Sequence, residues 1–171
     1  MRSRSKVITA SAMLTAIGLI LGYIETFIVI PVNVPGVRIG LANTVSLIAL
    51  YLLGPIYAFI VLVVRVTLSA LLFSGFSGFM YSMTGALLSF LIMCILKRFG
   101  FSVYSVSSGG AVAHNIGQLT VARILTGSVY VFWYMPVLII AGLVAGSFVG
   151  LLCNILIRRL RDIFDNERNN Q

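Results

Sequence analysis

Long apolar segments, broken only by short joints, constrain this chain more than any other feature. Six are visible, at roughly 7–30, 39–53, 55–73, 78–96, 103–126 and 132–157. A helix needs about 20 residues to cross the roughly 30 Å hydrocarbon core of a bilayer. The second segment is short, and Leu53-Gly54-Pro55 joins it tightly to the third. We therefore expect an all-α integral membrane protein, a bundle of about six transmembrane helices.

The composition excludes the soluble classes. Hydrophobic residues make up 60% of the chain and charged residues 9%, whereas soluble domains are about 45–50% apolar and about 25% charged. So few charges could not cover the surface of a soluble enzyme, and so much apolar surface does not fit a disordered chain. Cys94 and Cys153 lie in apolar runs without CxxC spacing, which favours packing over redox or disulfide roles.

The positions of the cations predict the topology. Nine of the 12 basic residues lie at segment ends or in the tails: Arg2, Arg4, Lys6, Lys97, Arg98, Arg158, Arg159, Arg161 and Arg168. Six spans with both termini in the cytoplasm place all nine inside, as the positive-inside rule requires. The net charge of +8 is thus explained without a nucleic-acid partner. The predicted location is the cell membrane, in direct contact with lipid.

The chain reads as one domain followed by a tail. We expect a single six-helix transmembrane domain over 1–157 and a charged cytoplasmic tail over 158–171, for which no fold is predicted. The basic start of the chain is similar to that of a signal peptide. The apolar run behind it is long and lacks a clear cleavage site, so we assign it to the first helix.

A few polar side chains fall inside the predicted spans. A charge at the membrane centre costs roughly 2.5–3.5 kcal/mol even on insertion scales, so each marks a candidate site. With the expected topology they gather in the outer half, which predicts a polar cavity open to the outside. The candidate ligand-binding residues are Glu25, Asn43, Arg65, His114, Asn115, Gln118 and Arg123, with Arg38 at the mouth of the second segment.

The charges favour an anionic or carbonyl-rich ligand, because guanidinium groups grip carboxylate and phosphate in a bidentate manner. On a helical wheel His114, Asn115 and Gln118 share one face, with Arg123 about 180° from His114. Two structural explanations stay open. Arg65 and Glu25 could simply pair, and the three polar residues of the fifth segment could only bond neighbouring helices.

Small residues recur at four-residue spacing in two segments. The first contains Ala12 and Ala16, followed by Gly18 and Gly22, and the last contains Gly142, Gly146 and Gly150. Small residues at this spacing let helix backbones approach closely. They indicate packing within the bundle or, for Ala12 and Ala16 near the cytoplasmic side, docking to a separate membrane subunit.

The sequence lacks the motifs for ATP hydrolysis, metal binding and diphosphate chemistry. The sequence has no GxxxxGK[ST] loop, which argues against ATP hydrolysis by that route. Its one histidine has no set of Cys or His partners for a metal. The aspartates, Asp162 and Asp165, lie in the tail without the clustered carboxylates that would hold magnesium on a diphosphate. We expect no catalytic residues, no metal and no cofactor.

Three stretches carry a family resemblance: Val37 to Asn43, Arg65 to Tyr81, and Gly110 to Gln118. They resemble the heptaprenyl diphosphate synthase component I family, also called the Gx transporter family, over about 7–157. That family in turn resembles the substrate-binding S components of energy-coupling-factor (ECF) transporters. The resemblance implies six helices, an outward-facing pocket and an Ala-x-x-x-Ala motif that docks a coupling subunit. Those roles fall on Ala12 and Ala16 for docking, and on Asn43, His114, Asn115 and Gln118 for the pocket.

Three functions follow from these observations. In the first, the chain is an S-component-like subunit that captures a small anionic ligand and works with a membrane coupling subunit and ATPases. In the second, it is a non-catalytic membrane component of a prenyl diphosphate synthase or quinone-linked complex, and its cavity takes an isoprenoid-like ligand. In the third, it is a structural subunit whose arginines only pair.

Overall fold

A computed structural model describes residues 4–25, 27 and 41–169, and every element in this part of the chain is helical. The α-helices are α1 (Arg4–Glu25), α2 (Asn43–Leu52), α3 (Pro55–Ser69), α4 (Gly75–Arg98), α5 (Val103–Thr126) and α6 (Met135–Asn169). A π-helical turn, η1 (Ala70–Ser74), joins α3 to α4, and a 3-10 helix, η2 (Val129–Tyr134), precedes α6. The all-α prediction is therefore confirmed.

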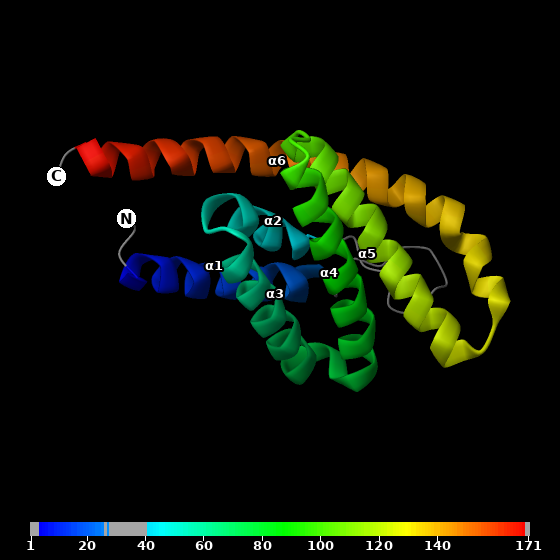
Figure 1. The fold of residues 1–171 in the computed structure, drawn as a ribbon. Helices are drawn as coiled ribbons and strands as arrows, with labels where there is room; N and C mark the ends of the chain where they lie inside the picture. Colours follow the sequence, from blue (N-terminus) through cyan, green and yellow to red (C-terminus); the bar gives the residue numbers. More distant parts are fainter. Residues whose placement is uncertain (1–3, 26, 28–40, 170–171) are drawn as a thin grey trace.

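Three helical stretches are long and apolar enough to cross a membrane: Arg4–Glu25, Pro55–Arg98 and Val129–Arg159. The second is 44 residues long, but it reverses at Gly75, whose φ of 64° favours glycine because other side chains rarely adopt it. Figure 1 shows α3 and α4 as the two legs of this hairpin. The chain is a membrane protein, and six spans remain a prediction.

Two further helices, α2 and α5, are not among these three stretches, and each is left out for a different reason. The short α2 has only ten residues, although Val45 through Leu50 are all buried. A helix that is buried all round in this way forms part of a core rather than a lipid-facing surface. Polar residues lower the hydropathy of α5, although its 24 residues are long enough to span a bilayer.

Helix ends follow local signals in the sequence. The Ser102 Oγ accepts a hydrogen bond from the Ser105 N–H at 3.3 Å and so caps the start of α5. At the other end of α5, Gly127 is left-handed and its N–H bonds the Arg123 carbonyl oxygen, which is a common helix stop. The helix α6 continues beyond 157, the predicted end of the last segment, to Asn169.

The bundle has two distinct ends. Figure 1 shows the start of α1 and the end of α6 toward the left and the α4–α5 turn at the top, whereas the α3–α4 and α5–α6 turns lie toward the bottom and the right. The Lys97 ammonium donates to the Leu50 carbonyl oxygen at 2.6 Å and lies 4.7 Å from the centre of the Tyr51 ring. This contact holds the last turn of α2 beside the last turn of α4. The main core cluster lies nearby, where residues of α2 to α6 pack together.

Candidate functional site: two small cavities that share Asn43

A cavity of about 20 Å³ lies among α1 to α5, and we call it the outer cavity after the topology that the sequence predicts. Its lining contains four of the eight predicted ligand-binding residues, together with Ala42, Val66 and Ser82. The four are Glu25, Asn43, Arg65 and His114. The structure thus brings together side chains from four helices that are far apart in the sequence.

Glu25 and Arg65 are both buried, each 6% exposed. The Glu25 Oε1 accepts a hydrogen bond from the Leu41 N–H at 2.6 Å, which ties the end of α1 to the residues before α2. The Arg65 Nη2 donates to the Asn43 Oδ1 at 3.3 Å. One carboxylate and one guanidinium therefore face the same cavity, and their formal charges cancel.

Glycines make room for these side chains. A Cβ added at Gly18 would lie 2.5 Å from the Arg65 Cδ, so the arginine stem runs directly against the backbone of α1. At the crossing of α4 and α5, a Cβ on Gly117 would lie 2.8 Å from the Gly85 Cα, and a Cβ on Gly85 would lie 2.9 Å from the His114 ring. His114 reaches the cavity because these two helices touch at glycines.

The other predicted ligand-binding residues lie elsewhere. The Asn115 Nδ2 donates to the Leu138 carbonyl oxygen at 2.8 Å, so Asn115 bonds α5 to α6. Gln118 is buried but does not line the cavity. Arg123 is half-buried in the last turn of α5 and does not line it either. Arg38 lies outside the described residues.

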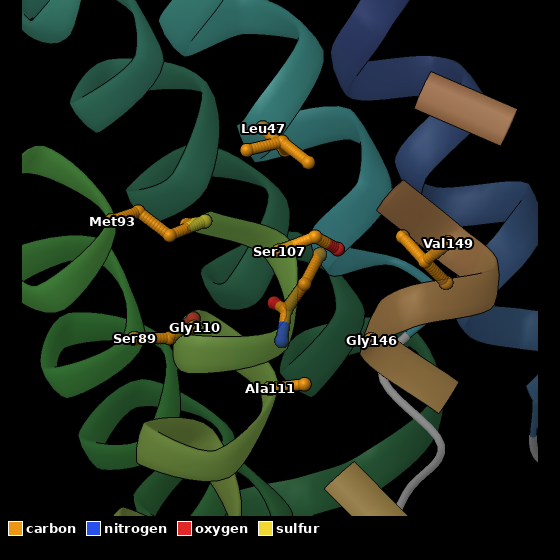
Figure 2. Close-up of a pocket in the computed structure, with 9 residues that line it drawn as sticks. Leu47, Ser89, Met93, Ser107, Gly110, Ala111, Gly146 and Val149 are labelled. Atoms are coloured by element: carbon orange, nitrogen blue, oxygen red, sulfur yellow. The ribbon is translucent and has the colours of Figure 1, made fainter. Parts of the chain in front are cut away.

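A second cavity, also of about 20 Å³, adjoins the same asparagine, and we call it the inner cavity after the same predicted topology. Asn43 lines both cavities, and the inner one continues between α2, α4, α5 and α6. Figure 2 draws its nine lining residues and labels all of them except Asn43: Leu47, Ser89, Met93, Ser107, Gly110, Ala111, Gly146 and Val149. The inner cavity carries no formal charge, in contrast to the outer one.

The lining serines were not among the residues predicted from the sequence. A serine in a membrane helix is ambiguous, because its hydroxyl can bond the carbonyl four residues back, as Ser11 does to Val7 at 2.8 Å. A weak signal existed in the spacing. Ser82, Gly85 and Ser89 recur at intervals of three and four residues, which places them on one face of α4.

The two small-residue stripes have different surroundings. Cβ atoms added at Gly142, Gly146 and Gly150 would all come within about 3 Å of α5 atoms, so the stripe on α6 packs inside the bundle. On α1, Gly18 and Gly22 are buried, whereas Ala12 and Ala16 are exposed. Of the two interpretations, internal packing therefore holds for α6, and the alanines of α1 are left facing outward.

Apolar helices around a buried, charged cavity define this chain as an all-helical membrane protein. It belongs to the heptaprenyl diphosphate synthase component I family, also called the Gx transporter family, whose model matches residues 14–156. The predicted family is thus confirmed. The description of the family names one component of a synthase, which implies further protein components. Comparison with curated proteins and with solved structures found no match.

Proposed function

We propose that this protein is a membrane-embedded, ligand-binding subunit similar to the S components of ECF transporters. The observation that carries the proposal is the outer cavity, where Glu25, Asn43, Arg65 and His114 converge from four helices. Burying a carboxylate and a guanidinium in a membrane bundle is costly, and such groups mark ligand or ion sites by default.

The ligand we propose is small and polar, and it enters from the outer side. An anion was expected from three arginines, but among the described residues only Arg65 lines the cavity, opposite Glu25. This balance supports a ligand that carries an acceptor for Arg65 and a donor for Glu25, such as a carboxylate-bearing molecule with an amine or hydroxyl. The cavity of about 20 Å³ holds little more than a water, so binding requires the helices to separate.

The proposed orientation has six spans and both termini in the cytoplasm of the cell membrane. Lys97 and Arg98 end α4, and Arg4 and Lys6 begin α1. The start of α1, the end of α6 and the α4–α5 turn all lie away from the α3–α4 and α5–α6 turns (Figure 1). This clustering of cations supports the assignment through the positive-inside rule. The outer cavity then lies toward the opposite face, because Glu25 ends α1 and Asn43 begins α2.

The proposed partner surface is the exposed face of α1. Ala12 and Ala16 lie there beside the exposed side chains of Met13, Ile17 and Ile20. A helix of a coupling subunit could approach closely over the two alanines. The ATPase subunits would bind through that coupling subunit, since this chain shows no phosphate-binding loop.

The docking part is tested by changing Ala12 and Ala16 to leucine and purifying the protein from its own membrane. We expect co-purifying membrane subunits to be lost. Ala141, an exposed alanine on α6, supplies the matched control, and Ala141→Leu should retain them. Retention of the same subunits by the double Ala12→Leu/Ala16→Leu variant would contradict the docking role.

The ligand part is tested by native mass spectrometry of the same wild-type preparation. A polar metabolite bound to the wild-type protein and absent from Arg65→Met supports the proposal. Arg123→Met is the control, because Arg123 does not line the cavity, and it should keep the ligand. A ligand that survives Arg65→Met would place binding elsewhere.

The description of the family favours a second candidate function, a non-catalytic membrane component of a heptaprenyl diphosphate synthase. In that case the preparation would contain a soluble synthase subunit or a prenyl diphosphate. Deleting the protein would also change the chain lengths of prenyl products, whereas the transporter proposal leaves them unchanged.

A further inference from the structure

The inner cavity contains two polar side chains, Ser89 and Ser107, that do not line the outer cavity, together with the shared Asn43. Three of its lining residues carry hydrogen-bonding side chains, namely Asn43, Ser89 and Ser107, and the other six are apolar or glycine (Figure 2). Its volume of about 20 Å³ exceeds the roughly 10–15 Å³ that one water requires.

The bond to Arg65 fixes the orientation of the Asn43 amide. A guanidinium has donors and no acceptor, so the Asn43 oxygen must face Arg65, as the 3.3 Å contact shows. The Asn43 Nδ2 is then directed away from Arg65. It is a buried atom without a hydrogen-bond partner among the residues that the structure describes.

Ser89, which lines the inner cavity as Asn43 does, presents a second unsatisfied group. Its side chain is 1% exposed, and within the described chain its hydroxyl has no hydrogen-bond partner, not even the carbonyl four residues back. Serines in helices commonly use that carbonyl. Buried polar groups that lack a protein partner are usually satisfied by ordered water.

We propose that the inner cavity is a hydration site, in which a water accepts from the Asn43 amide and bonds the Ser89 hydroxyl, with the Ser107 hydroxyl as a third partner. The water holds the Asn43 amide in the orientation that presents its oxygen to Arg65. The inner site therefore positions a residue of the outer cavity. This inference does not depend on whether the outer cavity binds a ligand.

Two methionines of α4 allow a direct test. Met93 lines the inner cavity and is 2% exposed, whereas Met83 is half-buried and packs against an apolar cluster around Leu62 and Val66. Brief X-ray radiolysis of the full protein in lipid nanodiscs makes hydroxyl radicals from water where the water lies. We expect oxidation at Met93 to exceed that at Met83, although Met93 is the less exposed.

The double variant Ser89→Ala/Ser107→Ala removes the two hydroxyls with little change of shape. Oxidation at Met93 should fall several-fold, because a single remaining amide does not hold a water that needs two to four partners. Ser82→Ala, which removes a hydroxyl from the outer cavity, should leave it unchanged.

Oxidation at Met93 that does not exceed oxidation at Met83 would overturn the inference. Equal oxidation of Met93 in the wild type and in the folded double variant would also overturn it. A second measurement covers a variant that does not fold. Wild-type protein mixed briefly with H₂¹⁸O before radiolysis should carry more ¹⁶O at Met93 than the same protein after full equilibration with H₂¹⁸O, since a buried water exchanges slowly. Equal isotope ratios after brief mixing and after equilibration would also overturn it.

Discussion

The two cavities meet at one asparagine but differ in the chemistry of their walls. The outer one is lined by a carboxylate, a guanidinium and an imidazole. The inner one is lined by hydroxyls, a thioether and small residues. The helices supply the difference, because α1 and α3 contribute only to the outer cavity and α6 only to the inner one. Among the residues that line the two cavities, charged side chains are thus confined to the outer one, where five helices meet.

Removing the cation of the outer cavity should have the largest effect. Arg65→Ala leaves the buried Glu25 carboxylate facing a cavity without an opposing charge among its lining residues. Breaking up buried charges in this way costs about 3–5 kcal/mol. Thermal unfolding in detergent should show a large loss of stability, and Arg65→Lys a smaller one. Arg123→Ala serves as the control, because Arg123 does not line the cavity. An equal loss of stability in this variant would contradict the special role of Arg65.

The next largest difference is expected between two glycine substitutions, one beside His114 and one at the inner cavity, in their effect on the free energy of unfolding. A Cβ on Gly117 would meet the backbone of α4 at Gly85 and Thr84, whereas one on Gly110 would meet the side chains of Met93 and Ser89. Backbone cannot yield as a methionine can, so Gly117→Ala should cost about 1–3 kcal/mol and Gly110→Ala less. Unfolding of the two variants side by side checks the order, and the reverse order would contradict this account.

Removing both charges of the outer cavity should make its lining chemically similar to that of the inner cavity. Glu25→Gln and Arg65→Met each leave one charge behind, whereas the double variant leaves an uncharged cavity like the inner one. The double variant should be more stable than the sum of the single losses predicts, with a coupling of about 1 kcal/mol or more. A double-mutant cycle of unfolding free energies measures it, and additive losses would show that the two charges do not interact.

The smallest effect is expected at Asn115, which lines neither cavity. Its bond to the Leu138 carbonyl oxygen is a single interhelical contact, and such bonds in membranes average about 0.6 kcal/mol. Asn115→Leu should therefore lower the unfolding free energy slightly and leave any ligand found with the wild type in place. Loss of that ligand would return Asn115 to the site.

The sequence predicted the helical class and the family from features that are local. Apolar runs indicate membrane helices because a bilayer requires every backbone group to be bonded within the helix. The bounds of the helices are less local, since α2 has ten residues and α6 extends past residue 157 to Asn169. Composition does not fix where a buried helix stops, since packing supplies the stabilising contacts.

The candidate site also combines residues that the sequence could select with an arrangement that only the structure shows. The cost of charge in a membrane was enough to select Glu25 and Arg65 from the sequence, and the structure places both at one cavity. Only the tertiary structure separated His114, which reaches that cavity, from Asn115, which bonds α6. The two are adjacent in sequence but point about 100° apart on the helix. Whether a polar group faces a cavity or a neighbouring helix depends on where glycines such as Gly85 and Gly117 let the helices touch.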